Sequence, residues 1–208
     1  MKHTQFLRQR WRGISATFSQ GLLNNLWQRL TKQGVQATTL WIVDHAVRII
    51  TGAPIQRTSQ ITTQLHVGGQ YRRRGWPILT SRGITAVVNM RLEFDDNHAG
   101  IAPKHYLYLP TVDDEAPTLE QLHTGVTYIT DQLNRGGSVY VHCGSGVGRA
   151  ATMAAAYLIS TGLRPDQAWA RIRETRPFIR PTAVQVAQIE RFVACEEKRV
   201  KNNPHLPA

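Results

Sequence analysis

Hydrophobic residues form two kinds of pattern, and segments of the two kinds alternate along much of the chain. Short apolar runs predict buried strands at residues 64–67, 84–90, 105–110 and 138–142. Apolar positions that recur every three or four residues predict helices over 117–135, 149–161, 165–176 and 182–200. Strands that alternate with helices are typical of an α/β domain, so we predict a central, mostly parallel sheet flanked by helices.

The first 57 residues differ from the rest in pattern and charge. Apolar residues four positions apart (Phe18, Leu22, Leu26, Leu30) and a second set (Leu40, Val43, Val47, Ile50) predict two amphipathic helices, which "TGAP" at 51–54 ends. This segment contains eight Lys or Arg residues but a single carboxylate, Asp44. We therefore predict a basic helical extension at 1–57 and a main domain at 58–200. The extension either packs on the main domain or lies on an anionic membrane surface, and both interpretations remain open.

Composition and charge indicate which classes of molecule the chain binds and in which compartment it lies. The 208 residues carry a net charge of +11, which favours anionic partners such as phosphate groups, anionic lipids or nucleic acid. No nucleic-acid motif or aromatic platform accompanies the charge, so we expect no nucleic acid. The two cysteines lack the spacing of a disulfide framework, which favours a reducing compartment. No segment is long and apolar enough to span a membrane. The expected location is therefore the cytoplasm, with membrane association if the extension lies on a bilayer.

The segment "VYVHCGSGVGRA" places a thiol and an arginine around three glycines. The strand at 138–142 brings Cys143 to the carboxyl edge of the sheet, where open α/β sheets bind ligands. The glycines let successive backbone N–H groups turn inward at the start of the next helix, which is an anion-binding arrangement. The predicted phosphate-binding residues are Gly144, Ser145, Gly146, Val147, Gly148 and Arg149, whose guanidinium can hold two phosphate oxygens.

The same surroundings favour the thiolate form of Cys143, because a helix N-terminus and a guanidinium both stabilise negative charge. A thiolate at the floor of a phosphate site can attack phosphorus, and water then hydrolyses the phosphocysteine. Neither a metal nor a cofactor is required. The plainer alternative is a glycine-rich turn with a buried thiol.

His142-Cys143-x5-Arg149 resembles the signature of the cysteine-dependent protein tyrosine phosphatase superfamily. The segments "ITTQLHVGG", "LTSRGITAVVNM", "YLYLPTVDDEAPT" and "RPFIRPT" occur in the order of its dual-specificity branch, over residues 58–195. The run from "TVD" to "ATMAAAYLI" is similar to the mitochondrial members that act on phosphatidylglycerophosphate. The resemblance implies a phosphatase-type sheet and hydrolysis of phosphate monoesters, on a phosphorylated protein or a phospholipid.

Two neighbouring carboxylates, Asp113 and Asp114, follow the strand at 105–110. The leaving group needs a proton, and a general acid contributes typically about 10²–10⁴-fold. The resemblance, aligned on "TVD" and Pro117, assigns the acid to Asp113, with Asp114 as the fallback. The alternative is that both carboxylates only favour the start of the next helix. For His142 the resemblance implies a role in orienting the loop, and a simple core role remains open.

Three further positions are left open by the sequence. Gln185 matches a glutamine that positions water in some relatives, or it lies on a helix surface. Glu93 is either an acid near the substrate or a solvated charge. Ala150 stands where the family usually has Ser or Thr, whose hydroxyl stabilises the leaving thiolate. This departure predicts a slower second step, and it keeps a catalytically weak phosphate-binding module as the alternative function.

Overall fold

A four-stranded sheet forms the centre of the computed structural model, which describes the backbone of residues 3–202 and the side chains of residues 26–199. The strands are β1 (Leu65–Gly69), β2 (Ile84–Arg91), β3 (His105–Thr111) and β4 (Ser138–Cys143). They lie in the order β1-β4-β2-β3, and each neighbouring pair is parallel. This arrangement confirms the predicted α/β fold with a parallel sheet.

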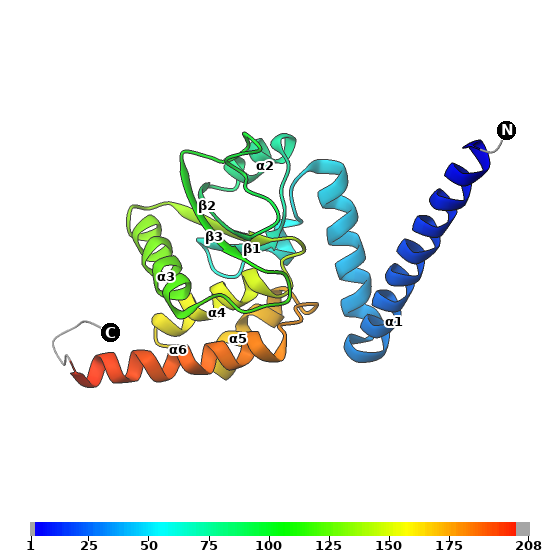
Figure 1. The fold of residues 1–208 in the computed structure, drawn as a ribbon. Coiled ribbons are helices and arrows are strands. Elements are labelled where there is room, and N and C mark those ends of the chain that lie inside the picture. Colours follow the sequence, from blue (N-terminus) through cyan, green and yellow to red (C-terminus); the bar gives the residue numbers. More distant parts are fainter. Residues whose placement is uncertain (1–2, 203–208) are drawn as a thin grey trace. The chain divides into compact units, whose positions relative to one another are not determined.

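Helices cover both faces of this sheet (Figure 1). The larger layer consists of α3 (Leu119–Asn134), α4 (Arg149–Ser160), α5 (Pro165–Thr175) and α6 (Ala183–Asn202). The short α2 (Trp76–Ser81) packs on the opposite face, and two 3₁₀ helices span Gln56–Thr58 and Arg73–Gly75. Val88 and Val141 face the larger layer, whereas their neighbours Val87 and Tyr140 face the smaller core. Burial of both faces explains why these strands are continuously apolar.

The parallel arrangement fixes where a site can form. Because all four strands run in the same direction, their carboxyl ends meet at one edge of the sheet. Open α/β sheets bind ligands at that edge. The segments that leave it begin at Gln70 after β1, at Leu92 after β2, at Val112 after β3 and at Gly144 after β4.

The chain forms two compact units, Met1–Ile42 and Val43–Ala208. Helix α1 (His3–Thr51) contributes to both, and Gly34, with φ 83°, interrupts its helical geometry. In the first unit, the Arg29 guanidinium lies 4.1 Å from the centre of the Trp41 ring. The predicted apolar positions Phe18 and Leu22 lie outside the described side chains. No described helix has the length and apolar character needed to cross a bilayer.

The end of α1 belongs to the second of these units, which begins at Val43, and the domain boundary at 57/58 stays a prediction. The Asp44 carboxylate accepts a hydrogen bond of 2.8 Å from the Thr58 hydroxyl and lies 3.8 Å from the Arg176 guanidinium. Arg48 donates to the carbonyl of Gln70 over 3.0 Å. These contacts attach the last turns of α1 to the domain that carries the sheet.

Candidate active site

Residues 143–149, here called the phosphate loop, connect β4 to α4. Every backbone carbonyl from 144 to 148 accepts a hydrogen bond from a donor outside this stretch. The donors are the N–H of Gln70, the Arg176 guanidinium at both residues 145 and 146, the N–H of Arg180 and the N–H of Thr152, at 2.8–3.3 Å. Because the carbonyls are held from outside, the opposite ends of the peptide groups turn inward.

The inward N–H groups are largely unpaired. The N–H of Gly146 donates to Cys143 Sγ over 3.3 Å. Within the described part of the chain, the N–H groups of residues 144, 145, 147 and 148 donate to no acceptor. Backbone N–H groups that converge in this way at a helix N-terminus bind anions. The structure therefore brings the predicted phosphate-binding residues together in one loop next to the buried Cys143, and anion binding by this loop stays a prediction.

Glycine is required at position 146 for two reasons. Its φ is +70°, which L side chains rarely adopt, and an added Cβ would lie 2.3 Å from the carbonyl carbon of Gly68. At Gly148 the neighbour is a side chain, because an added Cβ would lie 2.9 Å from Oε1 of Gln185. The loop is thus packed tightly against β1 on one side and α6 on the other.

Arg149 is 1% exposed and contacts two of the candidate acidic residues, Glu93 and Asp113. Its Nη1 donates to Glu93 Oε2 over 2.8 Å and to the carbonyl of Thr111 over 2.7 Å. Its Nη2 lies 2.9 Å from Glu93 Oε1 and 2.7 Å from Asp113 Oδ1. The buried Nε has no hydrogen-bond partner among the described residues. One donor of the guanidinium is therefore available to a ligand.

Glu93 is one of two carboxylates on Arg149. It binds the Nη1–Nη2 edge with both oxygens, and Arg91 Nε contacts Oε1 over 2.8 Å. The hydrogen bond from Arg149 lowers the pKa of Glu93 to about 2, against the opposing effect of partial burial. Burial opposes the charge of Arg149, but the hydrogen bond with Glu93 and the nearby anionic groups outweigh it and raise the arginine pKa. Glu93 is therefore in the site and is not simply a solvated charge.

The two neighbouring aspartates have different surroundings. Asp113 is paired with Arg149 while its side chain stays 76% exposed. Asp114 is exposed with a φ of +61°, and its carbonyl accepts a hydrogen bond of 2.9 Å from the Thr182 hydroxyl. The N-cap of α3 is Thr118, which forms a capping box with Gln121. Of the two carboxylates, the structure brings Asp113 to the phosphate loop, and neither lies in the first turn of α3.

The His142 side chain is fully buried against the carboxyl group of Asp96. Its Nε2 lies 2.7 Å from Asp96 Oδ2, and both side chains are 0% exposed. Tyr71 meets the His142 ring edge-on, and Tyr140 stacks on it. The sequence did not single out Asp96, although it is the last residue of the acidic stretch "NMRLEFDD". This contact fixes the residue next to Cys143, and the orienting role of His142 stays a prediction.

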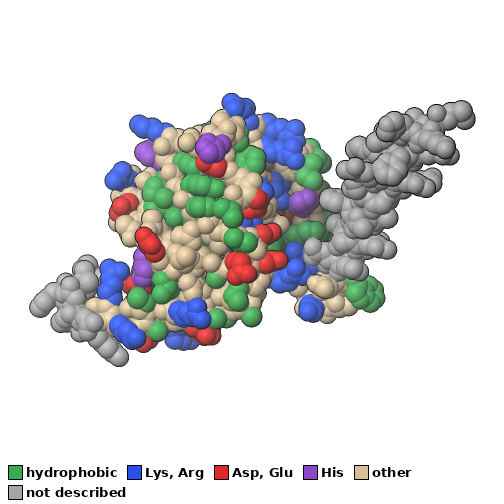
Figure 2. Space-filling model, viewed as in Figure 1, with side chains coloured by type: hydrophobic (Ala, Val, Ile, Leu, Met, Phe, Trp, Pro, Cys, Tyr) green, Lys and Arg blue, Asp and Glu red, His purple; other side chains and the backbone are tan. Residues whose placement is uncertain are grey.

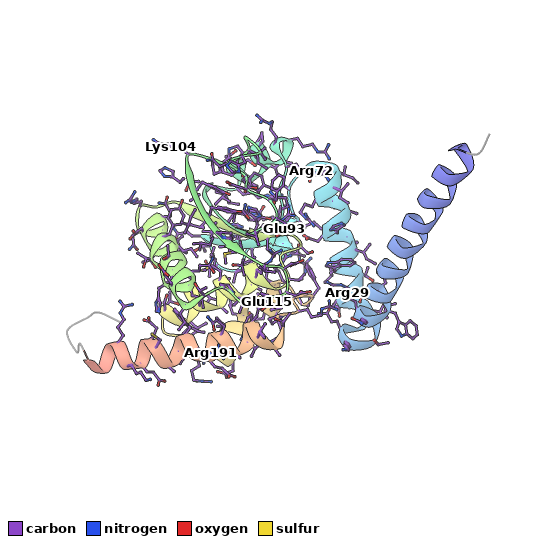
Figure 3. The ribbon with its side chains drawn as sticks, viewed as in Figure 1. Arg29, Arg72, Glu93, Lys104, Glu115 and Arg191 are labelled. Carbon is purple, nitrogen blue, oxygen red and sulfur yellow. The ribbon has the colours of Figure 1, made fainter. Side chains whose placement is uncertain are left out.

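Gln185 is 1% exposed, which contradicts the helix-surface alternative. Its Nε2 donates to the carbonyl of Glu115 over 2.9 Å, and its amide packs on Gly148. It therefore joins the segment after β3 to the phosphate loop. Glu93 and Glu115, from the segments after β2 and β3, lie on the same side of the second unit (Figure 3).

Two residues at the start of α4 bear on the missing hydroxyl. Ala150 is fully buried, and Thr152 donates its hydroxyl to the carbonyl of Gly148 over 3.1 Å. Thr152 therefore does not replace the absent Ser or Thr.

Arg176, which the sequence did not identify, is fully buried, and burial lowers its pKa despite the attraction of Asp44.

Comparison with known proteins places this site in a family. Residues 69–163 match a family described as "Polymorphic toxin system, DSP-PTPase phosphatase". Dual specificity protein phosphatase 14 of Mus musculus is 32% identical over 139 residues, which cover 65% of this chain and 69% of that protein. Dual specificity protein phosphatase 1 of Homo sapiens is 28% identical over 145 residues, which cover 68% of this chain and 37% of that protein. The chain thus spans little more than a third of the length of that relative.

A solved structure gives the same fold. The crystal structure of PTPMT1 in complex with PI(5)P superposes with a TM-score of 0.61 and 27% sequence identity, over 67% of this chain and 96% of that one.

Proposed function

The chain belongs to the dual-specificity branch of the cysteine-dependent protein tyrosine phosphatase superfamily, and from this premise we propose that it hydrolyses phosphate monoesters through a phosphocysteine intermediate. One observation carries the proposal. The N–H of Gly146 donates to the Cys143 thiol, while the N–H groups of residues 144, 145, 147 and 148 and the buried Nε of Arg149 have no acceptor among the described residues. A buried donor without an acceptor costs about 1–3 kcal/mol, and a phosphate group supplies the missing acceptors.

In the first step, Cys143 Sγ attacks phosphorus in line with the ester oxygen. The S–P bond forms as the P–O bond breaks, and the protonated Asp113 carboxyl gives its proton to the leaving oxygen. The equatorial oxygens take the loop N–H groups together with Nε and Nη2 of Arg149, where the transition-state charge is stabilised. Because Asp113 occupies Nη2 in this structure, phosphate binding displaces it toward the leaving group.

In the second step, water attacks phosphorus and the S–P bond breaks. The Asp113 carboxylate accepts the proton of the water, and the thiolate leaves. Gln185 is the proposed positioning group for this water, since its amide packs on Gly148. Glu93 keeps the guanidinium of Arg149 in one orientation through both steps, because its two oxygens hold the edge opposite to Nε.

The substrate is a phosphorylated protein or a phospholipid. The dual-specificity phosphatases point to the first class, and the PTPMT1 complex with PI(5)P points to the second. Exposed hydrophobic side chains follow β2 and β3 beside the two carboxylates: Leu92, Phe94 and Val112. Figure 2 shows acidic and hydrophobic side chains close together near the middle of the visible face. These side chains can contact the group that carries the phosphate, whether it is a peptide or a lipid.

For residues 1–57 we propose peripheral contact with an anionic membrane. Trp27 and Val35 are 69% and 72% exposed in the first unit, in a segment with a net positive charge. Exposed apolar side chains together with lysine and arginine favour binding to anionic lipid surfaces. A cytoplasmic location remains part of the proposal and agrees with the two free cysteines.

The test is turnover of p-nitrophenyl phosphate by the full chain and by Cys143→Ser. Loss of the nucleophile is expected to reduce kcat by at least about 10⁴-fold. Cys195→Ser, at the other cysteine, is the matched control and is expected to keep wild-type turnover. If the wild type binds tungstate but shows no turnover, the phosphate-binding module is the correct function. Phosphopeptides, phosphoinositides and phosphatidylglycerophosphate then separate the two substrate classes.

A further inference from the structure

Gln70 is the first residue after β1 and lies beside the phosphate loop. In the register of the sheet, Gly69 of β1 is paired with Cys143 of β4. The next residue along each strand is therefore also adjacent, and the N–H of Gln70 donates to the carbonyl of Gly144 over 3.1 Å. This hydrogen bond holds the first peptide group of the phosphate loop with its carbonyl directed outward.

The side chain of Gln70 connects to two other parts of the site. Its Nε2 donates to Asp96 Oδ1 over 2.7 Å, and the other oxygen of Asp96 holds His142. Its Oε1 accepts from Arg91 Nη1 over 2.9 Å, and Arg91 Nε contacts Glu93. Glu93 in turn holds Arg149. One amide therefore links the residue before the nucleophile to the residue that orients the phosphate-binding arginine.

Arg48, near the end of α1, holds the backbone of Gln70. Its Nη1 donates to the Gln70 carbonyl over 3.0 Å, and its Nη2 lies 2.7 Å from His45 Nδ1. The guanidinium lies against residue 69, where an added Cβ would be 2.6 Å from Cζ of Arg48. Only glycine leaves room for it there. Arg48 is 7% exposed, so this is a built contact of the interior and not a surface pairing.

We propose that Gln70 is a positioning residue for the phosphate loop and for Arg149, and that Arg48 anchors it from the N-terminal helix. The last turns of α1 are then part of the catalytic unit. Nothing in the motif or in the matched family segment, which begins at residue 69, includes Arg48. This inference rests on the proposed hydrolase function, and it adds residues that act on the reaction through others.

The chemistry of an amide explains why glutamine suits this position. The amide donates to a carboxylate on one side and accepts from a guanidinium on the other, without adding charge. A glutamate would place a second carboxylate against Asp96, and a leucine would leave Asp96 and Arg91 each without one partner. In both cases the groups that hold His142 and Glu93 lose their fixed arrangement.

The experiment compares Gln70→Leu and Arg48→Met with two matched controls. Gln64→Leu removes another glutamine that donates to backbone carbonyls, at the opposite end of β1. Arg82→Met removes another arginine that donates to the backbone near the end of α1, at Pro54. All variants carry Cys195→Ser, so that alkylation by iodoacetamide reports on Cys143 alone. The readouts are kcat and KM for p-nitrophenyl phosphate and the pH midpoint of alkylation.

Gln70→Leu is expected to reduce kcat/KM by about 10–100-fold, mainly through kcat, because a small displacement of catalytic groups has effects of this size. The alkylation midpoint moves to higher pH, since the loop and His142 support the thiolate less well. Arg48→Met gives a smaller change in the same direction, and Arg48→Lys restores part of it. The two controls lower the midpoint of urea unfolding but leave kcat and the alkylation midpoint at wild-type values.

Wild-type kcat and an unchanged alkylation midpoint in Gln70→Leu would overturn the inference. So would equal changes in the controls, because they would show a general loss of stability. If the wild type lacks turnover, the hydrolase proposal fails, but the alkylation midpoint and tungstate binding still report on the loop. The two failures are therefore distinguishable.

Discussion

Two segments meet at Arg149, and they are built in opposite ways. No residue of the phosphate loop, residues 143–149, is fully exposed, and its carbonyls from 144 to 148 are all held by donors outside that stretch. The segment after β3, residues 112–115 and here called the acid loop, is exposed, and the Asp113 side chain is 76% exposed. Both lie between a strand and a helix, so position in the fold does not explain the difference.

The roles proposed for the two loops in the reaction account for this difference. Groups that stabilise a transition state act best when they are already oriented, because no reorganisation is then needed during the reaction. A proton donor must instead exchange one partner for another. The acid loop is fixed on both sides of Asp113, at the carbonyls of Thr111, Asp114 and Glu115. The Val112 carbonyl accepts a hydrogen bond of 3.2 Å from the N–H of Glu115 within the loop, and among the described residues the Asp113 carbonyl has no such partner. The required movement is therefore confined to the surroundings of Asp113.

The largest effect should come from removing the mobile carboxylate. Asp113→Asn is expected to reduce kcat about 10²–10⁴-fold for an alkyl phosphate, because the leaving alkoxide needs a proton. The loss should be smaller for p-nitrophenyl phosphate, whose leaving group is more acidic. Asp114→Asn is the matched control and should stay close to wild type, since its side chain has no partner in the described structure. A greater loss in Asp114→Asn than in Asp113→Asn would reverse the assignment of the acid.

A second change tests the rigidity of the phosphate loop. Gly146→Ala places a Cβ against the backbone of Gly68 and is expected to lower kcat about 10²-fold by displacing the loop. Gly136→Ala is the matched control, because its φ is +80° but no heavy atom would lie within 4 Å of the new Cβ. In the control only backbone strain is expected, and it should lower the free energy of unfolding in urea by about 1–2 kcal/mol. Equal kcat in the two variants would show that the loop tolerates displacement.

The parts of this site that lie close together in the sequence were predictable. The strand, the nucleophile, the glycines and Arg149 are consecutive, and the periodic pattern places them at a strand-to-helix junction. The supporting residues are different, because their partners are distant in sequence. His142 and Asp96 are 46 residues apart, and Arg176 is 30 residues from the carbonyl of Gly146. A single polar residue in a sequence carries no sign of such a partner.

The same reason explains why the sequence left Glu93, Gln185 and the end of α1 open. A glutamate after a strand has the same local pattern whether it faces solvent or a buried arginine. The amphipathic spacing at 40–50 predicts a helix, but it does not say which surface that helix covers. Asp44 and Arg48 decide this through contacts with Thr58 and Gln70, which lie 14 and 22 residues further along the chain than their respective partners.

A third prediction concerns the start of α4. In the described structure, Cys143 Sγ accepts a hydrogen bond from the N–H of Gly146, and no hydroxyl contacts it. Ala150→Ser is expected to speed hydrolysis of the phosphocysteine by up to about tenfold, because a hydrogen bond to a charged sulfur stabilises the leaving thiolate. Rapid-quench trapping of the intermediate measures this step. Thr152→Val is the control and should leave the step unchanged. The absence of trapped intermediate in the wild type would argue against a slow second step.

The smallest effect concerns how firmly Glu93 holds Arg149 at different pH. Its pKa is about 2 in the folded protein, against 4.5 for an ordinary glutamate, so the folded state favours its charged form. The stability this contributes is fully present above pH 4.5 and is lost as the pH falls through 2. Because the side chain is 41% exposed, solvent screening limits it to less than about 1 kcal/mol. The wild type should therefore exceed Glu93→Gln in unfolding free energy at pH 6, and the difference should shrink toward pH 2.5.

Urea unfolding at several pH values measures this difference, and Glu190→Gln on the exposed side of α6 is the control. Glu190 has no ion pair among the described residues, so its replacement should not reproduce the trend. If Glu93→Gln matched the wild type at every pH, the two oxygens of Glu93 would not be holding the arginine through charge. The orientation of the phosphate-binding arginine would then depend on the neutral contact with the carbonyl of Thr111 and on packing. The acid loop, which begins directly after Thr111, would then contribute more to the fixed geometry of the site than its exposure indicates.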